Sequence, residues 1–246
     1  MQKSVYGLIG KNIGYSFSKN YFNTFFETNQ YSNCQYTNFD IEDISEFKSI
    51  IKNNPEIQGF NVTIPYKEAI IPYLEKLSNK AKKIGAVNVI RITKKGKIKG
   101  YNSDYYGFKK ALKPLLKPHH KKALILGTGG ASKGIAYALS ELNIQYTFVS
   151  RNNLDNSIIY TDITAETYDN YQIIINCTPL GTSPNVDKCP DIPYQYFTKN
   201  HIAFDLIYNP SESLFLQKAK QQNAVTKNGL DMLIFQAEKS WEIWNK

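Results

Sequence analysis

Cysteine and histidine are both scarce in this sequence. Its 246 residues include only three of each, and the cysteines, Cys34, Cys177 and Cys189, form no C-x-x-C pair. An odd number of cysteines without metal-ligand spacing argues against a disulfide scaffold and against a zinc ribbon. We therefore expect reduced thiols in a cytoplasmic protein. So few histidines supply little for histidine-based catalysis, and we expect no metal site.

Long apolar runs are missing too. No stretch approaches the ~20 apolar residues of a membrane-spanning helix, and the apolar run after Met1 is too short for a signal peptide. Acidic residues are outnumbered, with 21 Asp and Glu against 30 Lys and Arg, which gives a formal net charge of +9. This charge suits nucleic acid or an anionic small ligand and does not choose between them. We expect no membrane partner.

What the sequence does contain is an alternation of short apolar strands with amphipathic helices. Hydrophobic residues make up 42% of the chain, enough for a sizeable core. The alternation predicts an α/β fold with largely parallel sheets. The polar stretch 152–170 is left without an assignment. Strands are expected at 5–9, 35–39, 59–62, 86–92, 97–101, 123–126, 146–149, 173–175 and 202–204, and helices from Ser18, across 44–51, from Ser103 or Asp104 towards Pro114, after the turn at 127–130, at 214–220 and at 230–244.

A glycine-rich turn, G-T-G-G-A-S, follows the strand expected at 123–126. Gly127 permits a tight turn and Gly129 lets the main chain approach a pyrophosphate, while the helix that follows offers unpaired N–H groups. Ser132 stands at the third position of the G-x-G-x-x-G/A fingerprint, and serine is small enough for close helix–strand packing. The strand–turn–helix context predicts a dinucleotide-binding site.

The end of the next strand indicates which dinucleotide is bound. NAD is usually held there by an Asp or Glu, about 20 residues past the glycines. This chain has Ser150, Arg151 and Asn152 instead. An arginine with hydroxyl and amide donors attracts a 2′-phosphate that a carboxylate would repel, which favours NADP(H). The alternative is that Arg151 merely lies on the surface at the end of a strand.

Two segments of the first half carry unusual polar groups. S-F-S at 16–18 places two hydroxyls at a helix start, and N-V-T-I-P-Y-K at 61–67 places an amide, a hydroxyl and an amine at a strand end. Further segments of mixed polar and apolar character follow at intervals. They are G-A-V-N at 85–88, Y-N-S-D-Y-Y-G at 101–107, S-R-N at 150–152, N-C-T-P-L-G at 176–181, D-L-I-Y-N-P at 205–210 and N-G-L-D-M-L-I-F-Q-A at 228–237.

With these segments in this order, the sequence resembles the shikimate dehydrogenase family over nearly its whole length. The resemblance implies an N-terminal α/β substrate domain at 1–103 completed by 228–246, a Rossmann-like NADP-binding domain at 104–227, and a C-terminal helix that returns to the first domain. It also implies reversible NADPH-dependent reduction of 3-dehydroshikimate to shikimate, within the chorismate (aromatic amino-acid) pathway. The expected partner is this small-molecule substrate, without nucleic acid, and the expected state is a monomer or homodimer.

The resemblance also implies roles for individual residues. Lys67 matches the catalytic lysine and Asp104 its partner. An alcohol releases hydride efficiently only if its O–H proton also leaves, and the reverse reaction needs a proton donor, so a lysine beside the carbinol oxygen can serve both directions. The implied substrate ligands are Ser16, Ser18, Asn61, Thr63, Asn88, Tyr208 and Gln236. The implied cofactor ligands are Gly127, Thr128, Gly129, Gly130, Ala131, Ser150, Arg151, Asn152, Thr178, Leu206 and Gly229.

The sequence departs from the family pattern in places. The usual N-T-D-G reads N-S-D-Y at 102–105, Val89 follows G-A-V-N where threonine is usual, and the basic residue expected soon after Arg151 is missing. An NAD-preferring quinate/shikimate dehydrogenase is therefore an alternative. A basic nucleic-acid-binding protein is an alternative from another class, although no helix-turn-helix, zinc or RRM signature is visible. A catalytically inactive sensor would lack Lys67 or Asp104, and this chain keeps both.

Overall fold

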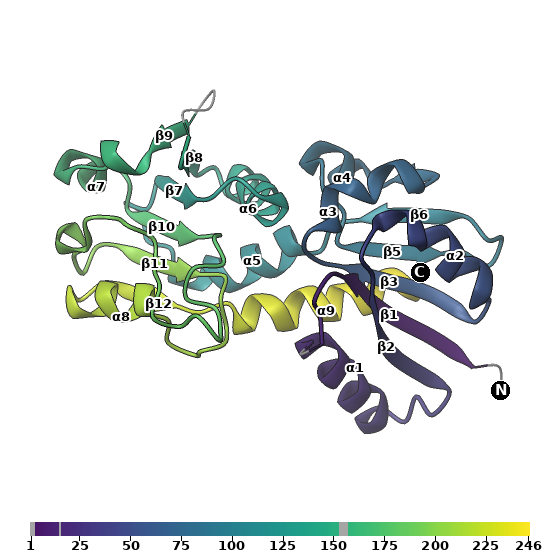
Figure 1. Cartoon of the computed structure of the whole chain (residues 1–246). Coiled ribbons are helices and arrows are strands. Elements are labelled where there is room, and N and C mark those ends of the chain that lie inside the picture. The colour runs from purple at the N-terminus through teal and green to yellow at the C-terminus, as the bar shows by residue number, and fades with distance from the viewer. Residues whose placement is uncertain (1–2, 15, 153–156) are drawn as a thin grey trace. The chain divides into compact units, whose positions relative to one another are not determined.

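The computed structural model describes residues 3–14, 16–152 and 157–246. The chain divides into two compact units, one made of Met1–Ser103 with Gln236–Lys246 and the other of Asp104–Phe235 (Figure 1). The second division lies inside the last helix, after Phe235, whereas the expected boundary at 227/228 lies before that helix. The C-terminal part of that helix therefore belongs to the first unit.

The first unit contains a mixed sheet with the strand order β2-β1-β3-β5-β6-β4. Strand β1 pairs in parallel with β2 and β3, and β4 pairs in parallel with β6. Strand β5 runs antiparallel to both β3 and β6. The strands are β1 (Ser4–Gly10), β2 (Cys34–Asp40), β3 (Ile57–Val62), β4 (Lys76–Leu77), β5 (Val89–Ile92) and β6 (Ile98–Tyr101).

Helices cover both faces of this sheet. Side chains along a strand alternate between the two faces, and β1 carries apolar residues on both, so each face needs a covering layer. Val5 and Ile9 pack into a cluster with residues of α2, α3 and α4. Tyr6 and Leu8 pack into the opposite cluster with residues of α1 and α9. Trp244, near the C-terminus, anchors α9 there by stacking on Tyr6 at 4.7 Å between ring centroids. The helices are α1 (Phe17–Thr28), α2 (Phe47–Asn53), α3 (Tyr66–Ala69), α4 (Asn79–Ile84) and α9 (Leu230–Trp244).

The second unit contains a sheet in which all pairs are parallel, with the order β12-β11-β10-β7-β8-β9. From β7 the chain adds β8 and β9 on one side and then β10, β11 and β12 on the other, so the order of the strands reverses between β7 and β10. In open parallel sheets of this kind, ligands bind at such a switch point, beyond the carboxyl ends of the strands. The strands are β7 (Lys122–Leu126), β8 (Gln145–Ser150), β9 (Ser157–Ile159), β10 (Ile173–Asn176), β11 (Ile202–Asp205) and β12 (Val225–Lys227).

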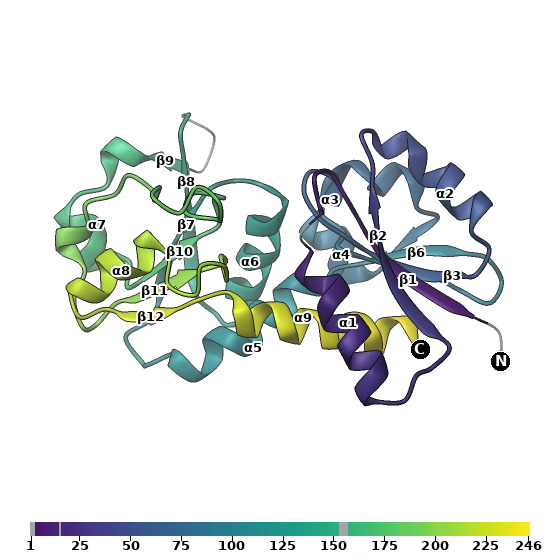
Figure 2. The ribbon, with the colours of Figure 1, turned by 60° about the horizontal axis from the view of Figure 1, so that its bottom comes forward.

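Both faces of this second sheet are buried, which is why its central strands read as continuous apolar runs. Tyr168 of α7 and Phe215 of α8 pack against Leu124 and Ile174 on one face. Phe108 of α5 packs edge-on against Phe204 of β11 on the other, beside α6. The helical layers can be followed in Figure 2. The helices are α5 (Asp104–Leu112), α6 (Gly130–Glu141), α7 (Ala165–Asn170) and α8 (Leu214–Gln221), and short 3₁₀ turns lie at Ile44–Glu46, Ile71–Tyr73, Lys113–Leu115, Tyr160–Asp162 and Tyr194–Tyr196.

The structure differs from the sequence-based expectation in two respects. Helix α1 begins earlier than expected, because Ser16, and not Ser18, is its N-cap. Strands β4, β9 and β12 and helices α3, α4 and α7 have no counterpart among the expected elements, because two to six residues are too few to produce a periodic pattern. Part of the unassigned polar stretch, 153–156, lies outside the described residues. No helix within the described ranges is long and apolar enough to cross a membrane.

Candidate active site

The start of α1 carries the two serines expected to bind a carboxylate. Ser16 Oγ accepts a hydrogen bond from Lys19 N at 3.4 Å, which leaves the Ser16 hydroxyl proton for another acceptor. Ser18, in the first helical turn, is hydrogen-bonded to the hydroxyl of Tyr36. The first turn contains no acidic residue. The positive end of the helix dipole is therefore available to an anion.

Tyr36 connects Ser18 to the amide of Asn61. Its ring is fully buried, and burial holds its pKa well above the ordinary value. The Tyr36 hydroxyl donates to Asn61 Oδ1 at 2.8 Å. Asn61 Nδ2 donates to Ser240 Oγ at 2.9 Å and to the Asn88 carbonyl at 3.3 Å. Both amide hydrogens of Asn61 are thus used inside the protein, and its remaining capacity is to accept through Oδ1.

Asn88 and Gln236 form the other half of this buried network. Asn88 Oδ1 accepts from Ser103 N at 2.6 Å, and Asn88 Nδ2 donates to Ser103 Oγ at 3.0 Å and to Gln236 Oε1 at 3.4 Å. Ser103 Oγ lies 3.3 Å from both Gln236 Oε1 and Ser240 Oγ. Ser240 Oγ donates to the Gln236 carbonyl at 2.8 Å. Asn61, Asn88 and Gln236, three of the expected substrate ligands, are therefore joined by direct or one-step hydrogen bonds.

Three members of the network were not among the expected site residues: Tyr36, Ser103 and Ser240. Ser240 stands four residues after Gln236 on α9, and residues at that spacing share one helix face, which is the local signal that points to it. Ser103 lies directly before Asp104 in the motif that contains both. Tyr36 carries no such signal, because its contact with Asn61 joins β2 and β3, which lie on either side of β1 and are separated in sequence.

The segment after β3 holds Thr63 and Lys67. Thr63 N donates to the Ile9 carbonyl at 2.9 Å, and Val87 N donates to the Lys67 carbonyl at 2.7 Å. Lys67 is half-buried in the short helix α3. The main chain of Lys67 is therefore hydrogen-bonded to the segment just before β5, which also carries Asn88. The methyl group of Thr63 lies so close to Gly10 that a Cβ at Gly10 would be 2.5 Å from it.

Asp104 is the first residue of α5 and belongs to the second unit. Its side chain is buried, with the residue only 5% exposed. The chain immediately before it is fixed by the two hydrogen bonds between Asn88 and Ser103. Tyr208, also in the second unit, is half-buried, and burial raises the pKa of its hydroxyl.

The glycine turn of the second unit lies at the carboxyl end of β7. Gly127 has φ +99°, and a Cβ there would lie 3.2 Å from Thr178 Cγ2. Gly129 is the N-cap of α6 and caps it with no side chain. A Cβ at Gly129 would meet nothing within 4 Å. The space beside Gly129 is therefore open and the start of α6 has no side-chain cap, so the residues present, with Thr128, Gly130 and Ala131, fit a pyrophosphate.

The neighbouring strand ends carry the remaining expected cofactor ligands. Ser150 is buried at the end of β8, and Asn152 N donates to its hydroxyl at 3.3 Å. Arg151 is exposed. Partial burial raises the pKa of the half-buried Tyr160, and the positive charge of Arg151 opposes this shift. Leu206 and Gly229 are in direct contact, because a Cβ at Gly229 would lie 2.1 Å from the Leu206 carbonyl oxygen.

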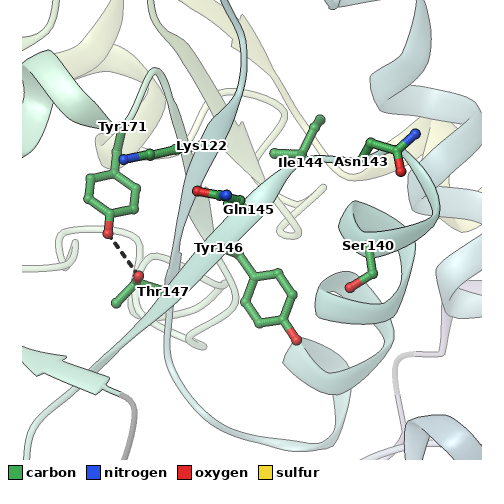
Figure 3. A pocket seen from close by; sticks show the side chains of 8 residues that line it. All are labelled: Lys122, Ser140, Asn143, Ile144, Gln145, Tyr146, Thr147 and Tyr171. Carbon is green, nitrogen blue, oxygen red and sulfur yellow. Dashed lines mark hydrogen bonds between the residues drawn. The ribbon is translucent and has the colours of Figure 1, made fainter.

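A pocket of about 620 Å³ opens elsewhere on the second unit, at the amino ends of the strands (Figure 3). Lys122 and Gln145, the first residues of β7 and β8, line it, and so do Thr147 and Tyr171, whose hydroxyls are 2.9 Å apart. None of the expected site residues lines it. Because the glycine turn lies at the opposite ends of these strands, this pocket is separate from the candidate cofactor site.

Among the described residues, no group of three or more His, Cys, Asp or Glu could hold a metal ion.

The doubly wound parallel sheet with a glycine turn at its switch point places the chain in the class of two-unit α/β dinucleotide-binding proteins. A model of the shikimate dehydrogenase substrate binding domain matches residues 8–90. The chain is 41% identical to a shikimate dehydrogenase (NADP(+)) of Clostridium botulinum, over 97% of this chain and 95% of that protein. A crystal structure of a shikimate dehydrogenase in complex with NADP+ covers 98% of this chain and 90% of its own, at 33% identity and a TM-score of 0.86. The Thermus thermophilus shikimate 5-dehydrogenase in complex with NADP(H) and shikimate is 26% identical, with a TM-score of 0.86 over 98% of this chain and 93% of its own.

The chain belongs to the shikimate dehydrogenase family. The resemblance noted in the sequence is thereby confirmed, and so is the α/β fold class with an N-terminal substrate domain and a Rossmann-like domain.

Proposed function

We propose that this protein is an NADP-dependent dehydrogenase that reversibly reduces 3-dehydroshikimate to shikimate, in the pathway that leads to chorismate. Family membership supports the reaction. The single observation that carries the substrate assignment is the buried amide–hydroxyl network of Asn61, Asn88 and Gln236. Amides held in fixed orientations in a buried setting suit a ring that carries several hydroxyls, because each hydroxyl both donates and accepts.

The substrate ligands divide into two groups by chemistry. Asn61 accepts from a ring hydroxyl through Oδ1, since its amide hydrogens are already used, and Asn88 and Gln236 contact the neighbouring hydroxyls. Ser16 and Ser18, at the positive end of α1, bind the ring carboxylate, assisted by Thr63 and Tyr208. A carboxylate at a helix N-terminus receives both hydrogen bonds and favourable dipole interaction.

The proton chemistry is assigned to Lys67 and Asp104. In the reductive direction the Lys67 ammonium gives its proton to the oxygen that becomes the alcohol, and in the oxidative direction the neutral amine takes that proton back. The carboxylate of Asp104 accepts hydrogen bonds from the amine and from the substrate hydroxyl, which orients both. The first unit, with the end of α9, supplies Lys67 and the substrate ligands other than Tyr208, whereas Tyr208, Asp104 and the dinucleotide ligands belong to the second unit.

NADPH, when bound, supplies the hydride that reduces the ketone carbon. The residues that hold it are the glycine turn at 127–131, Thr178, Leu206 and Gly229, together with Ser150, Arg151 and Asn152 at the 2′-phosphate. The open space at Gly129 and the uncapped start of α6 support this assignment.

None of the three cysteines forms a disulfide, which suits a reducing, cytoplasmic location.

The reaction itself is tested by the loss of NADPH absorbance on addition of 3-dehydroshikimate. We expect oxidation of NADPH that depends on this substrate, and the reverse reaction with shikimate and NADP. NADPH that stays unchanged in the presence of 3-dehydroshikimate, by a protein that is folded by circular dichroism, would refute the proposed function. A response to DNA instead, with strong salt dependence and no binding of NADPH, would favour the nucleic-acid alternative.

Cofactor selectivity tests the role of Arg151. We expect kcat/KM for NADP to exceed kcat/KM for NAD, and Arg151→Ala to lower only the NADP value, by about 10-fold or more, because a hydrogen-bonded ion pair with phosphate is lost. Arg91, which lies on β5 of the first unit, is the matched control, since Arg91→Ala removes the same charge from another unit. A clear NAD preference of the wild type would favour the quinate/shikimate alternative.

Ser16→Ala tests the carboxylate site. We expect the KM for shikimate to rise about 10-fold, because a hydrogen bond to a charged group contributes ~1.5–3 kcal/mol, with the KM for NADP unchanged. Ser78→Ala is the matched control: Ser78 caps α4 by accepting from Ala81 N at 3.2 Å, as Ser16 caps α1. Equal effects of the two variants on melting temperature, without a selective rise in the shikimate KM for Ser16→Ala, would make Ser16 a helix cap only.

A further inference from the structure

A buried carboxylate, Asp205, lies at the carboxyl end of β11, next to β10 in the sheet (Figure 1). It is completely buried. Its Oδ1 accepts from Asn176 Nδ2 and from Ile207 N, each at 3.0 Å, and its Oδ2 accepts from the hydroxyl of Ser213. Burial raises the pKa of this carboxyl to about 6, although the three hydrogen bonds favour the ionised form. The mechanism above assigns no role to this group.

The carboxylate fixes the orientation of the Asn176 amide. A carboxylate only accepts hydrogen bonds, so it draws the NH₂ group of Asn176 towards itself and turns Asn176 Oδ1 the other way. That oxygen accepts from Thr178 N at 2.9 Å and from Thr178 Oγ1 at 2.7 Å. The single hydroxyl hydrogen of Thr178 therefore points to Asn176, and Thr178 Oγ1, which also accepts from Leu180 N at 3.3 Å, can act towards a ligand only as an acceptor.

The same carboxylate holds the loop after β11. Ile207 N is bound to Asp205, and Leu206 N donates to the Asn176 carbonyl at 3.0 Å. Gly229 N donates to the Ile207 carbonyl at 3.0 Å, and Gly229 packs directly on Leu206. On the other side, Thr178 packs on Gly127. The four expected cofactor ligands of this edge, Gly127, Thr178, Leu206 and Gly229, are thus all connected to Asp205 through short chains of contacts.

We propose that Asp205 is a positioning residue for the nicotinamide end of the dinucleotide site, acting through Asn176 on Thr178 and through Ile207 on Leu206. The inference rests on the proposed function, because it assumes that the edge formed by Thr178, Leu206 and Gly229 binds the dinucleotide. Asp205 itself does not contact the ligand. It sets the direction of the Thr178 hydroxyl and the spacing between the two loops.

Asp205→Leu is the first test, with NADPH as the probe and its fluorescence on binding as the readout. A leucine has a similar shape but no acceptor oxygen, so Asn176 Nδ2 and Ile207 N both lose their partner. We expect the Kd for NADPH to rise about 10-fold to 100-fold, as for lost hydrogen bonds to a charged group, with the Kd for shikimate, measured by calorimetry, unchanged. Ser213→Ala is the control, because it removes the donor to Oδ2 and leaves the Asn176 contact intact, so its NADPH Kd should stay near wild type.

Thr178→Val is the second test, and it serves even if Asp205→Leu does not fold. It keeps the shape of Thr178 and removes only the hydroxyl, and we expect a rise in the NADPH Kd. In the double variant the two effects should not add, because both act through one hydrogen-bond chain. An unchanged NADPH Kd in Asp205→Leu or in Thr178→Val, additive effects, or a Ser213→Ala effect as large as that of Asp205→Leu would overturn the proposal. A wild-type protein that does not bind NADPH at all would instead overturn the proposed function.

Discussion

Lys67→Ala is expected to lower kcat by about 10²–10⁴-fold in both directions, the range that general acid–base groups contribute. The variant has no group to give the alkoxide its proton or to take the alcohol proton away. Binding of the ring by Asn61, Asn88 and Gln236 does not need the amine, so the KM for shikimate should stay within a few-fold of wild type. A loss of kcat and kcat/KM by the same factor is the signature of an interaction made only in the transition state.

Two further variants separate proton transfer from charge and from stability. Lys67→Arg keeps the positive charge but cannot release a proton, because guanidinium stays protonated in proteins, so it should be nearly as inactive as Lys67→Ala. Lys82→Ala, which removes an exposed lysine from α4 of the same unit, should retain full activity. Wild-type kcat in Lys67→Ala would exclude Lys67 from the reaction, and activity in Lys67→Arg would show that its charge alone suffices.

The fold could be predicted from the sequence where a local pattern is long enough to carry it. The central strands of the second sheet were expected because burial on both faces makes them unbroken apolar runs, such as Ala123–Leu126 and Ile173–Ile175. The edge strands β4, β9 and β12 have two or three residues each, and pairing with a neighbour, not their own sequence, makes them strands. The start of α1 shows the same limit, because Ser16 and Ser18 both suit an N-cap. Tertiary structure decides between them, since Ser18 is bonded to Tyr36.

The site could be predicted only as far as its motifs extend. Asn61, Asn88 and Gln236 belong to recognisable segments, but the hydroxyls that orient them do not all share those segments. Ser240 bonds to Asn61 across 179 positions of sequence, and Tyr36 does so across 25. Such pairs result from packing of α9 and β2 around β3, and local spacing contains no trace of them. Asp205 was part of a recognised motif, yet its connection to Asn176 and Thr178 appears only when β10 and β11 lie side by side.

Gly129→Ala is expected to weaken NADPH binding by about 10-fold or more without destabilising the protein. The second glycine of the turn lets the main chain approach the pyrophosphate, and a methyl group there lengthens hydrogen bonds to a charged group that contribute ~1.5–3 kcal/mol each. In the protein without ligand the new Cβ meets nothing within 4 Å, and φ of −75° is ordinary for alanine. The entropy gain of replacing glycine, ~0.4–1 kcal/mol, is offset by alanine's poorer fit as an N-cap, ~1 kcal/mol.

Gly229→Ala provides the contrasting case, because affinity and stability should change together. Its Cβ would lie 2.1 Å from the carbonyl oxygen of Leu206, so one of the two loops must move. We expect a lower melting temperature and weaker NADPH binding for Gly229→Ala, against an unchanged melting temperature and weaker binding for Gly129→Ala. Gly14→Ala, where a Cβ also meets nothing within 4 Å but in the first unit, should leave NADPH affinity unchanged. Wild-type NADPH affinity in Gly129→Ala would show instead that the pyrophosphate binds away from this turn.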